Sequence, residues 1–344
     1  MKSADISILF LGVESGTCLD RASALRRLGY KVKHINLLDV LPKSRWVWRI
    51  TWKVGGDVFS PWILRRLPSM LKDMYFDVCF VDSGEWVTPR VIALLRQHAR
   101  KIINYNIDDP LGMRDAARFI AYRRSLPYYD LCAVVRAENV AEAQALGAKA
   151  VLRVYRSADE VSHAPRLLLD EDRRKWASEV MFLGTWFPER GPFLLKLARL
   201  GVPLTIRGSN WNKAAEWSEL RKFWKGGQLQ GDDYAKAIQC ARVNLGLVSK
   251  GNRDLHTTRS LEIPAIGGLL CAERTSEHLA MFVEGEEALY WDSVEECAAV
   301  CLSVLKDEPR RLRIAAAGHA RGLRDGYYNQ NVMKCLIDRA LAAP

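Results

Sequence analysis

Apolar and polar positions along the first half of the chain follow a pattern typical of alternating strands and helices. Residues 6–11 form a short apolar run like a strand, and residues 15–28 repeat apolar side chains at helical spacing up to Gly29. Further strands are predicted at 31–35, 76–81, 102–105 and 130–135, with helices over 90–98 and 137–146. This order predicts a parallel sheet with helices on both faces. We therefore interpret the first apolar run as a strand and not as a signal peptide.

A polar segment interrupts this order, and a second strand–helix series follows it. Residues 159–175 contain Pro165 and the charged run Asp-Glu-Asp-Arg-Arg-Lys, which indicates a domain boundary. Strands are then predicted at 180–183, 204–207, 243–247, 269–272 and 288–291, with helices between them and from residue 294 onward. The predicted class is α/β, with two Rossmann-like doubly wound domains facing an interdomain cleft that would hold the ligands. The predicted division is 1–160 for the first domain, 161–177 for a linker, 178–325 for the second domain and 326–344 for a C-terminal helix that could cross back to the first.

Composition and charge narrow the class of protein. The chain has 344 residues, of which 49% are apolar and 26% charged, as in soluble globular proteins with two cores. No apolar run reaches the ~18 residues of a transmembrane helix. The eight cysteines are scattered without a Cys-x-x-Cys motif, so we expect reduced core residues in a cytoplasmic protein and no metal site. The net charge of +11 fits a solvated basic surface as well as an anionic partner, such as a phosphate ligand, a nucleic acid or an acidic membrane, and does not choose among them.

Loops after two first-half strands carry candidate functional residues. The glycines of residues 12–16 would let the backbone approach a ligand, and the helix start that follows favours an anion, although a plain tight turn has the same pattern. Asp108 and Asp109 follow the strand at 102–105, where a catalytic base could lie. Asp109 precedes a proline and could instead only form a turn. Glu85, after the strand at 76–81, is a further carboxylate candidate.

The second half concentrates cations around a predicted helix start. Lys250, Arg253 and Arg259 lie close in sequence to Thr257 and Thr258, and Glu262 follows within the helix. Cations and helix-start amides suit a diphosphate, and a nearby carboxylate can accept both hydroxyls of a ribose. The alternative is a solvated charged loop with a capped helix.

The run from Arg259 to Gly268, with 277–282 and 286–290, resembles the donor-site region of GT-B glycosyltransferases. It is most similar to the spore-maturation-type (CgeB-like) family. Residues 182–190 and 206–211 resemble other parts of that domain, and the Asp-Asp-Pro sequence at 108–110 resembles an element of the family's N-terminal domain. Over residues 1–150 the resemblance is mainly one of pattern.

The resemblance implies a nucleotide-sugar-dependent glycosyltransferase of bacterial cell-surface or spore-surface glycan synthesis that needs no metal or other cofactor. Glu262 matches the glutamate that holds the nucleotide ribose, and Asp254 stands where many retaining members have a glutamate. Asp108 and Asp109 are the catalytic candidates if transfer inverts. A nucleotide-sugar epimerase of the same fold and a non-catalytic nucleotide- or glycan-binding protein are the alternatives. For the glycosyltransferase, the predicted donor-binding residues are Gly184, Thr185, Arg190, Arg207, Gly208, Lys250, Asp254, His256, Thr258, Arg259 and Glu262. The predicted acceptor-side residues are Gly12, Glu14, Ser15, Gly16 and Glu85.

Residues 42–68 are unusually rich in tryptophan and basic residues. They hold four of the eleven tryptophans and six basic residues, with one acid. This composition is typical of a membrane interface. It predicts peripheral contact with the inner face of the cell membrane and a glycan or lipid-linked acceptor, beside the nucleotide-sugar donor. A helical excursion that packs its indoles onto the first domain is the alternative, and no nucleic acid partner is expected.

Overall fold

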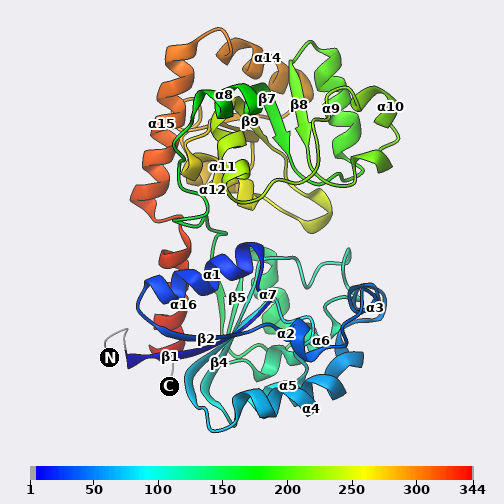
Figure 1. Ribbon diagram of the computed structural model, residues 1–344, viewed down its shortest axis with the longest axis vertical. Helices are drawn as coiled ribbons and strands as arrows, with labels where there is room; N and C mark the ends of the chain where they lie inside the picture. Colours follow the sequence, from blue (N-terminus) through cyan, green and yellow to red (C-terminus); the bar gives the residue numbers. More distant parts are fainter. Residues whose placement is uncertain (1–4, 343–344) are drawn as a thin grey trace. The chain divides into compact units, whose positions relative to one another are not determined.

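The computed structural model describes residues 5–342 and divides them into two compact units (Figure 1). Unit 1 contains the described chain up to Arg156, the short segment Lys250–Arg253 and the chain from Asn329. Unit 2 contains Ser157–Ser249 and Asp254–Tyr328. Each unit has one sheet, and all strands within each sheet run parallel.

The sheet of unit 1 is buried on both faces. Its strands follow the order β2-β1-β3-β4-β5-β6. Leu9 and Leu11 pack into one hydrophobic cluster, whereas Ile8 and Phe10 pack into another, because successive side chains of a strand point to opposite faces. Burial on both faces explains why β1 is a nearly continuous apolar run in the sequence, whereas the edge strand β2 alternates exposed and more buried residues. The strands are β1 (Ser7–Leu11), β2 (Lys31–Ile35), β3 (Phe76–Asp82), β4 (Ala99–Asn106), β5 (Leu131–Val134) and β6 (Val151–Arg153).

Helices from both ends of the chain cover this sheet. α16 packs beside α1, and its Met333, Leu336 and Ile337 are buried in the cluster that contains Ile8. The C-terminal helix is therefore part of the core of unit 1. The α-helices of unit 1 are α1 (Gly16–Arg27), α2 (Leu37–Val40), α3 (Trp46–Val54), α4 (Ser60–Leu71), α5 (Pro89–Leu95), α6 (Ile120–Ser125), α7 (Ala137–Ala145) and α16 (Asn329–Ala342), and its 3-10 turns are η2 (Asp57–Phe59), η3 (Leu126–Tyr128) and η5 (Lys250–Asn252).

The sheet of unit 2 has the strand order β11-β10-β9-β7-β8. Val180, Phe182 and Val243 lie in its core, against apolar side chains of the surrounding helices. The strands are β7 (Ser178–Leu183), β8 (Leu204–Arg207), β9 (Ala241–Gly246), β10 (Leu270–Glu273) and β11 (Leu289–Trp291). The helices are α8 (Asp170–Trp176), α9 (Arg190–Arg199), α10 (Trp217–Leu220), α11 (Gly231–Cys240), α12 (Thr258–Ile266), α13 (Ser276–Met281), α14 (Val294–Val304) and α15 (Glu308–Asp325), with the 3-10 turn η4 (Trp211–Lys213).

The predicted α/β class with two parallel sheets is confirmed. Residues 161–177, for which the sequence predicts a linker, lie in unit 2 and contain α8. α8 packs on α11, where Lys236 binds Asp172 at 3.0 Å. A signal for this helix does exist in the sequence. Its first turn is acidic and its last turn is basic, which is the charge order that stabilises a helix dipole.

Two features of the described chain bear on membranes and metals. None of its helices combines the length and the apolarity that crossing a bilayer requires. The eight cysteines are free, and Cys271, Cys297 and Cys301 form a buried group in unit 2 with sulfur atoms within 4.8 Å of one another. The spacing of the cysteines along the chain did not predict this group. It offers three ligands, whereas structural zinc sites take four.

Candidate active site

The carboxyl ends of three neighbouring strands surround a pocket of about 270 Å³ in unit 1, the unit-1 pocket. It lies where the chain leaves β1, β3 and β4, and the N-terminus of α1 opens onto it. Ligands of parallel sheets bind beyond these strand ends. Trp48 of α3 and Trp86 form an aromatic part of its wall, with ring centroids 4.7 Å apart. The predicted site residues that line it are Gly12, Ser15, Gly16, Glu85 and Asp108.

Two arginines neutralise the carboxylates of the unit-1 pocket. Arg21 binds Asp82 through two hydrogen bonds of 2.6 and 2.9 Å, and both side chains are buried. Arg118 binds Glu85 at 2.7 Å and Asp108 at 3.0 Å. Burial alone would lower the pKa of Arg118, but the charges of Glu85 and Asp108 outweigh burial and raise it. The pocket therefore presents ion pairs, not isolated charges.

Ser83 gives the unit-1 pocket an unused hydrogen-bonding group. Its hydroxyl is buried and has no hydrogen-bond partner among the residues that the structure describes. Its φ of 65° lies in the left-handed region, which a serine adopts at a cost and which recurs at ligand sites.

Asp109 lies outside the unit-1 pocket and serves a different set of contacts. Its carboxylate receives two hydrogen bonds from Arg253, at 2.7 and 2.8 Å, and one from Asn139 at 2.9 Å. Burial alone would raise the pKa of Asp109, but these hydrogen bonds and the charge of Arg136 lower it. Arg253 also binds Glu142, and Arg136 donates to the Asn252 carbonyl at 2.6 Å. Asp109 thus fixes the segment Lys250–Arg253 within unit 1.

A second pocket, of about 200 Å³, lies at the carboxyl ends of β7 and β9 in unit 2 and is called the unit-2 pocket. The starts of α9 and α12 contribute Arg190 and Thr258 to it, so helix-start amides gather there. Amides and partial positive charge at helix starts favour an anion. The predicted site residues that line this pocket are Gly184, Thr185, Arg190, Thr258 and Arg259.

Arg190 is a buried cation without a carboxylate partner in the described part of the chain. Its guanidinium donates to the carbonyls of Thr185 at 2.8 Å and Leu247 at 3.1 Å, and lies 4.5 Å from the ring centroid of Phe187. Within residues 5–342, its Nε makes no hydrogen bond, and neither does the buried hydroxyl of Thr257. Burial lowers the pKa of Arg190 to about 10. The charges of Glu189, Glu273 and Asp254 oppose this shift without cancelling it. Burying a charge is costly, and an anionic ligand would offset that cost.

Glu262 forms an ion pair with Arg259, the second arginine that lines the unit-2 pocket. Its Oε2 accepts hydrogen bonds of 2.5 Å from both Arg259 and the Tyr234 hydroxyl, and His163 lies 3.5 Å from Oε1. Burial alone would raise the pKa of Glu262, but the charges of Arg259 and His163 and these hydrogen bonds lower it. Arg259 lines the unit-2 pocket, whereas Glu262 lies buried behind it.

The chain was compared with known protein families and solved structures. Residues 190–338 match the family model described as "Glycosyl transferase-like". The structure is similar to sucrose-phosphate synthase from Thermosynechococcus elongatus, with a TM-score of 0.70, 13% identity, and 98% of this chain and 100% of that one covered. HepE from Anabaena, in complex with UDP and glucose, gives a TM-score of 0.64 at 11% identity over 98% and 100% of the two chains. This chain has the GT-B fold.

The same fold also carries other reactions. A putative UDP-N-acetylglucosamine 2-epimerase from Listeria monocytogenes gives a TM-score of 0.57 at 10% identity, over 98% of both chains. At such identities the likeness shows the fold alone. No sequence among the curated proteins matches this chain.

The other predicted donor-binding residues of this GT-B chain lie outside the unit-2 pocket. Arg207 lies 4.8 Å over the ring of Trp176. A side chain on Gly208 would come within 2.0 Å of the Gly184 carbonyl, so this glycine is needed for a close backbone approach. Lys250 is exposed and belongs to the segment held in unit 1. Asp254 is buried, and His256 is buried against Glu277; among the acceptor-side residues, Glu14 does not line the unit-1 pocket.

Sequence patterns missed more of the residues that line the two pockets than they found. The missed residues of the unit-1 pocket include Arg21, Trp48, Asp82, Trp86 and Arg118, and those of the unit-2 pocket include Phe182, Phe187, Leu245, Leu247 and Thr257. A signal existed for Asp82, which ends a predicted strand. Arg118 lies in a stretch without periodicity, so no sequence pattern could have placed it beside Glu85.

His278, next to the first turn of α12, makes stability depend on pH. Its Nδ1 lies 2.6 Å from the Glu273 carbonyl, so it donates there, and its Nε2 accepts from the Ser260 hydroxyl at 2.7 Å. Burial lowers the pKa of His278 in the folded protein. As the pH falls below about 6.5, the unfolded chain therefore takes up a proton that the folded protein does not, and stability falls by up to about 1.4 kcal/mol per pH unit.

We expect His278→Gln to reduce this pH slope, because glutamine can keep both hydrogen bonds without titrating. Urea unfolding between about pH 7.5 and about pH 5.5 measures the slope. Burial also lowers the pKa of His34, which would supply a remaining slope in the variant. An unchanged slope in His278→Gln would contradict the assignment.

Proposed function

We propose that this GT-B protein is a glycosyltransferase that moves a sugar from a nucleoside-diphosphate sugar to an acceptor hydroxyl. The observation that carries the proposal is Arg190, a buried cation without a carboxylate partner among the described residues, at the rim of a pocket formed by two helix starts. Arg190 is also the first residue of the segment that matches the glycosyl transferase-like model. A diphosphate is an anion that this combination of amides and guanidinium groups suits.

The unit-2 pocket offers what a departing diphosphate needs. When the bond between the sugar and the diphosphate breaks, negative charge develops on the leaving oxygen. Arg190, Arg259 and the helix-start amides would stabilise that charge, and the Thr257 hydroxyl would donate a hydrogen bond. We propose that these groups act without a metal ion. The UDP and glucose bound to HepE, which shares the fold, support a nucleotide-sugar donor here.

The unit-1 pocket supplies the acceptor side of the proposal. In an inverting transfer, Asp108 accepts the proton of the acceptor hydroxyl while the hydroxyl oxygen bonds to the anomeric carbon and the nucleoside diphosphate leaves. Asp108 is favoured over Asp109 because it lines the pocket and is 37% exposed, whereas Asp109 is buried in its contacts with Arg253. A retaining transfer would need no protein base at this place.

The biological setting proposed for this reaction is that of the CgeB-like group. It comprises bacterial cell-surface or spore-surface glycan synthesis in the cytoplasm, with a glycan or lipid-linked acceptor and peripheral contact of 42–68 with the inner face of the membrane. The resemblance of residues 259–268 to that group supports this setting.

A screen of nucleotides tests the donor side. UDP, GDP, dTDP, ADP, CMP and their sugars are added to the protein, and we expect one nucleoside diphosphate to raise the melting temperature by mass action. The matching nucleotide-sugar should then release its nucleoside diphosphate only when an acceptor is present, at a rate unchanged by EDTA. If no nucleotide raises the melting temperature, the proposal fails.

Asp108→Asn divides binding from transfer. The variant should keep the nucleotide-induced shift, and it should lose inverting transfer because asparagine cannot take the proton. Glu14→Gln is the matched control, since Glu14 belongs to the same unit but does not line the pocket. Full transfer in Asp108→Asn would remove Asp108 as the base.

The epimerase is the second candidate because a putative epimerase shares the fold along the whole chain. It differs in a directly measurable way, since it would convert the nucleotide-sugar without any acceptor. A non-catalytic binding protein would show the thermal shift and no turnover with any donor and acceptor.

A further inference from the structure

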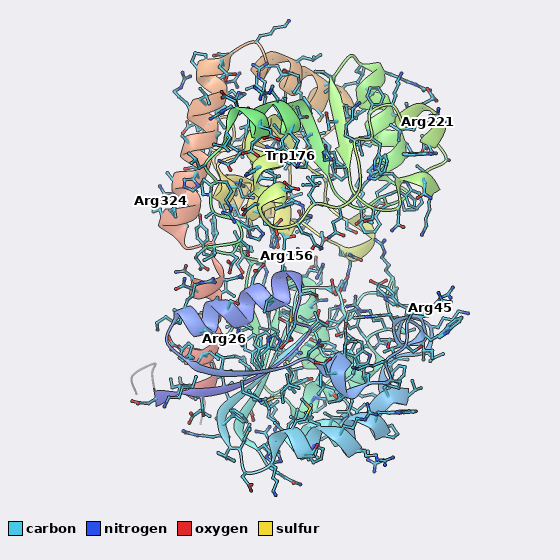
Figure 2. The ribbon with its side chains drawn as sticks, in the orientation of Figure 1. Arg26, Arg45, Arg156, Trp176, Arg221 and Arg324 are labelled. Carbon is cyan, nitrogen blue, oxygen red and sulfur yellow. The ribbon has the colours of Figure 1, made fainter. Side chains whose placement is uncertain are left out.

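Exposed tryptophans, aliphatic residues and cations lie on α3, η2 and α4 and just before α3, and we call these side chains the α3 surface. Trp46, Trp52 and Trp62 are 52%, 47% and 43% exposed. Figure 2 shows Arg45 at the edge of unit 1. The other exposed residues of this surface are the apolar Ile50, Val54 and Val58 and the cationic Lys43, Arg45, Arg49, Lys53, Arg65 and Arg66. Clustered exposed aromatic and aliphatic side chains indicate a binding surface.

The sequence of α3 explains why this surface stays outside. Val47 and Thr51 are buried, so they form the inner face. Trp46, Ile50 and Val54 follow one another at intervals of four, which places them in one exposed stripe on the helix. α3 therefore has two apolar sides, of which only the inner one packs into the core.

The charge of the α3 surface favours a negatively charged partner. Residues 42–68 contain six basic residues and one acid, Asp57. Asp57 binds Arg124 at 2.6 Å, so it does not neutralise the cations of the surface. The guanidinium of Arg49 lies 4.7 Å from the ring centroid of Trp46 and makes a cation–π contact with it.

The aliphatic residues favour a bilayer over a nucleic acid. Tryptophan can stack on bases and arginine can bind phosphates, so these two residue types suit both partners. The aliphatic residues of the α3 surface are also exposed: Ile50 by 38%, Val54 by 53% and Val58 by 46%. Aliphatic side chains gain free energy by leaving water for the acyl region of a membrane, and they have no such gain on a phosphate backbone.

α3 also forms part of the wall of the unit-1 pocket. Its Trp48 lines that pocket, and its Thr51 hydroxyl accepts a hydrogen bond of 2.9 Å from the Trp86 indole. Arg118, which holds Asp108, lies 4.9 Å from the ring centroid of Trp52. The helix α3 thus carries exposed residues of the α3 surface and also Trp48, which lines the unit-1 pocket.

We propose that the α3 surface binds the headgroup region of an anionic lipid bilayer and that the acceptor is an amphiphile of that bilayer. Its polar head enters the unit-1 pocket beside α3 while its acyl part stays among the lipids. The assignment of the acceptor rests on the proposed glycosyltransferase function, whereas bilayer binding does not.

Sedimentation with lipid vesicles tests the surface. We expect the full chain to bind vesicles that contain about one-third phosphatidylglycerol in phosphatidylcholine, and to bind pure phosphatidylcholine far less. Replacing Arg45, Arg49 and Lys53 by glutamine should weaken binding to the anionic vesicles about 100-fold, at about 1 kcal/mol for each cation. Replacing Trp46, Trp52 and Trp62 by alanine should weaken it at least about tenfold, because apolar burial is lost.

A matched variant controls for net charge. Arg26, Lys31 and Lys33 are exposed cations of the same unit, and Figure 2 shows Arg26 on the opposite side of unit 1 from Arg45 in that view. Their replacement by glutamine should leave vesicle binding within about threefold of the wild type. Equal loss in this control, absence of vesicle binding, or binding to a single-stranded RNA in place of vesicles would overturn the proposal.

The nucleotide thermal shift without vesicles keeps the two proposals apart. All three variants should keep the shift, which also shows that they are folded. A nucleotide shift without vesicle binding overturns the bilayer proposal alone, and vesicle binding without a nucleotide shift overturns the donor site alone. For the acceptor, transfer should occur to a hydroxyl of a vesicle lipid and fall with the loss of binding in the tryptophan variant. If the wild type and the tryptophan variant transferred sugar to a water-soluble glycan at the same rate, the amphiphile assignment would be overturned.

Discussion

Glu262→Ala is expected to lower the free energy of unfolding by about 3–5 kcal/mol. The substitution leaves the buried Tyr234 hydroxyl without its acceptor and removes the negative partner of Arg259. It also removes the carboxylate that lies 3.5 Å from His163. Urea unfolding measures the loss. Glu219→Ala is the control, since its ion pair with Arg199 is exposed and should contribute at most about 1 kcal/mol.

Glu262→Gln separates charge from shape. Glutamine keeps a hydrogen-bond acceptor in place but cannot ionise. The pKa of Glu262 is lowered in the folded protein, so its contribution to stability is present above the pKa of an unfolded glutamate, about 4.3, and is lost as the pH falls through the folded value. The wild type should therefore lose more stability than Glu262→Gln when the pH falls below about 4.3. Parallel curves would show that the carboxylate is not held by Arg259 and His163 as described.

Nucleotide affinity distinguishes two roles of Glu262. If its carboxylate binds the ribose, as the family resemblance implies, Glu262→Gln should weaken nucleotide binding more than tenfold, since a charge-assisted hydrogen bond contributes about 1.5–3 kcal/mol. If it only positions Arg259, Glu262→Gln should bind nucleotide almost normally. In that case Arg259→Gln should still weaken binding, because Arg259 itself lines the pocket.

Arg190→Met is expected to weaken nucleoside diphosphate binding about tenfold to 100-fold, the worth of a lost charge-assisted hydrogen bond. The apo protein should unfold at almost the wild-type temperature. Arg190 is a buried charge without a carboxylate partner in the described chain, so removing it relieves a desolvation cost that offsets the two lost hydrogen bonds to Thr185 and Leu247. Methionine is also apolar enough to pack near Phe187.

Titration calorimetry with the nucleoside diphosphate found in the screen measures this effect. Arg199→Met is the matched control, because Arg199 lies at the other end of the same helix and pairs with Glu219 on the surface. The control should bind nucleotide like the wild type. Wild-type affinity in Arg190→Met would show that the unit-2 pocket is not the diphosphate site.

Local patterns in the sequence determined most of the secondary structure around both pockets. The predicted strands at 31–35 and 204–207 coincide with β2 and β8, because turn residues mark their limits: Gly29 shortly precedes β2 and Gly208 directly follows β8. The start of α12 was also predicted, because two threonines and an arginine follow one another there. For residues 42–68 the sequence offered a helical excursion only as the alternative to a membrane interface and predicted no bounds for α3 and α4, because the tryptophans and arginines fitted both.

The sequence by itself determined the class of the fold, the sheet edges that carry polar residues and the cationic tryptophan-rich segment, since each depends on neighbours along the chain. Only the tertiary structure decided which polar residues meet. Asp108 and Asp109 are adjacent in sequence, yet one lines a pocket and the other binds Arg253 from a segment far along the chain. Likewise, among the described residues, Arg190 lacks a carboxylate partner while Arg259 has Glu262. Burial and pairing arise from contacts between distant segments, so the spacing of residues along the chain does not contain them.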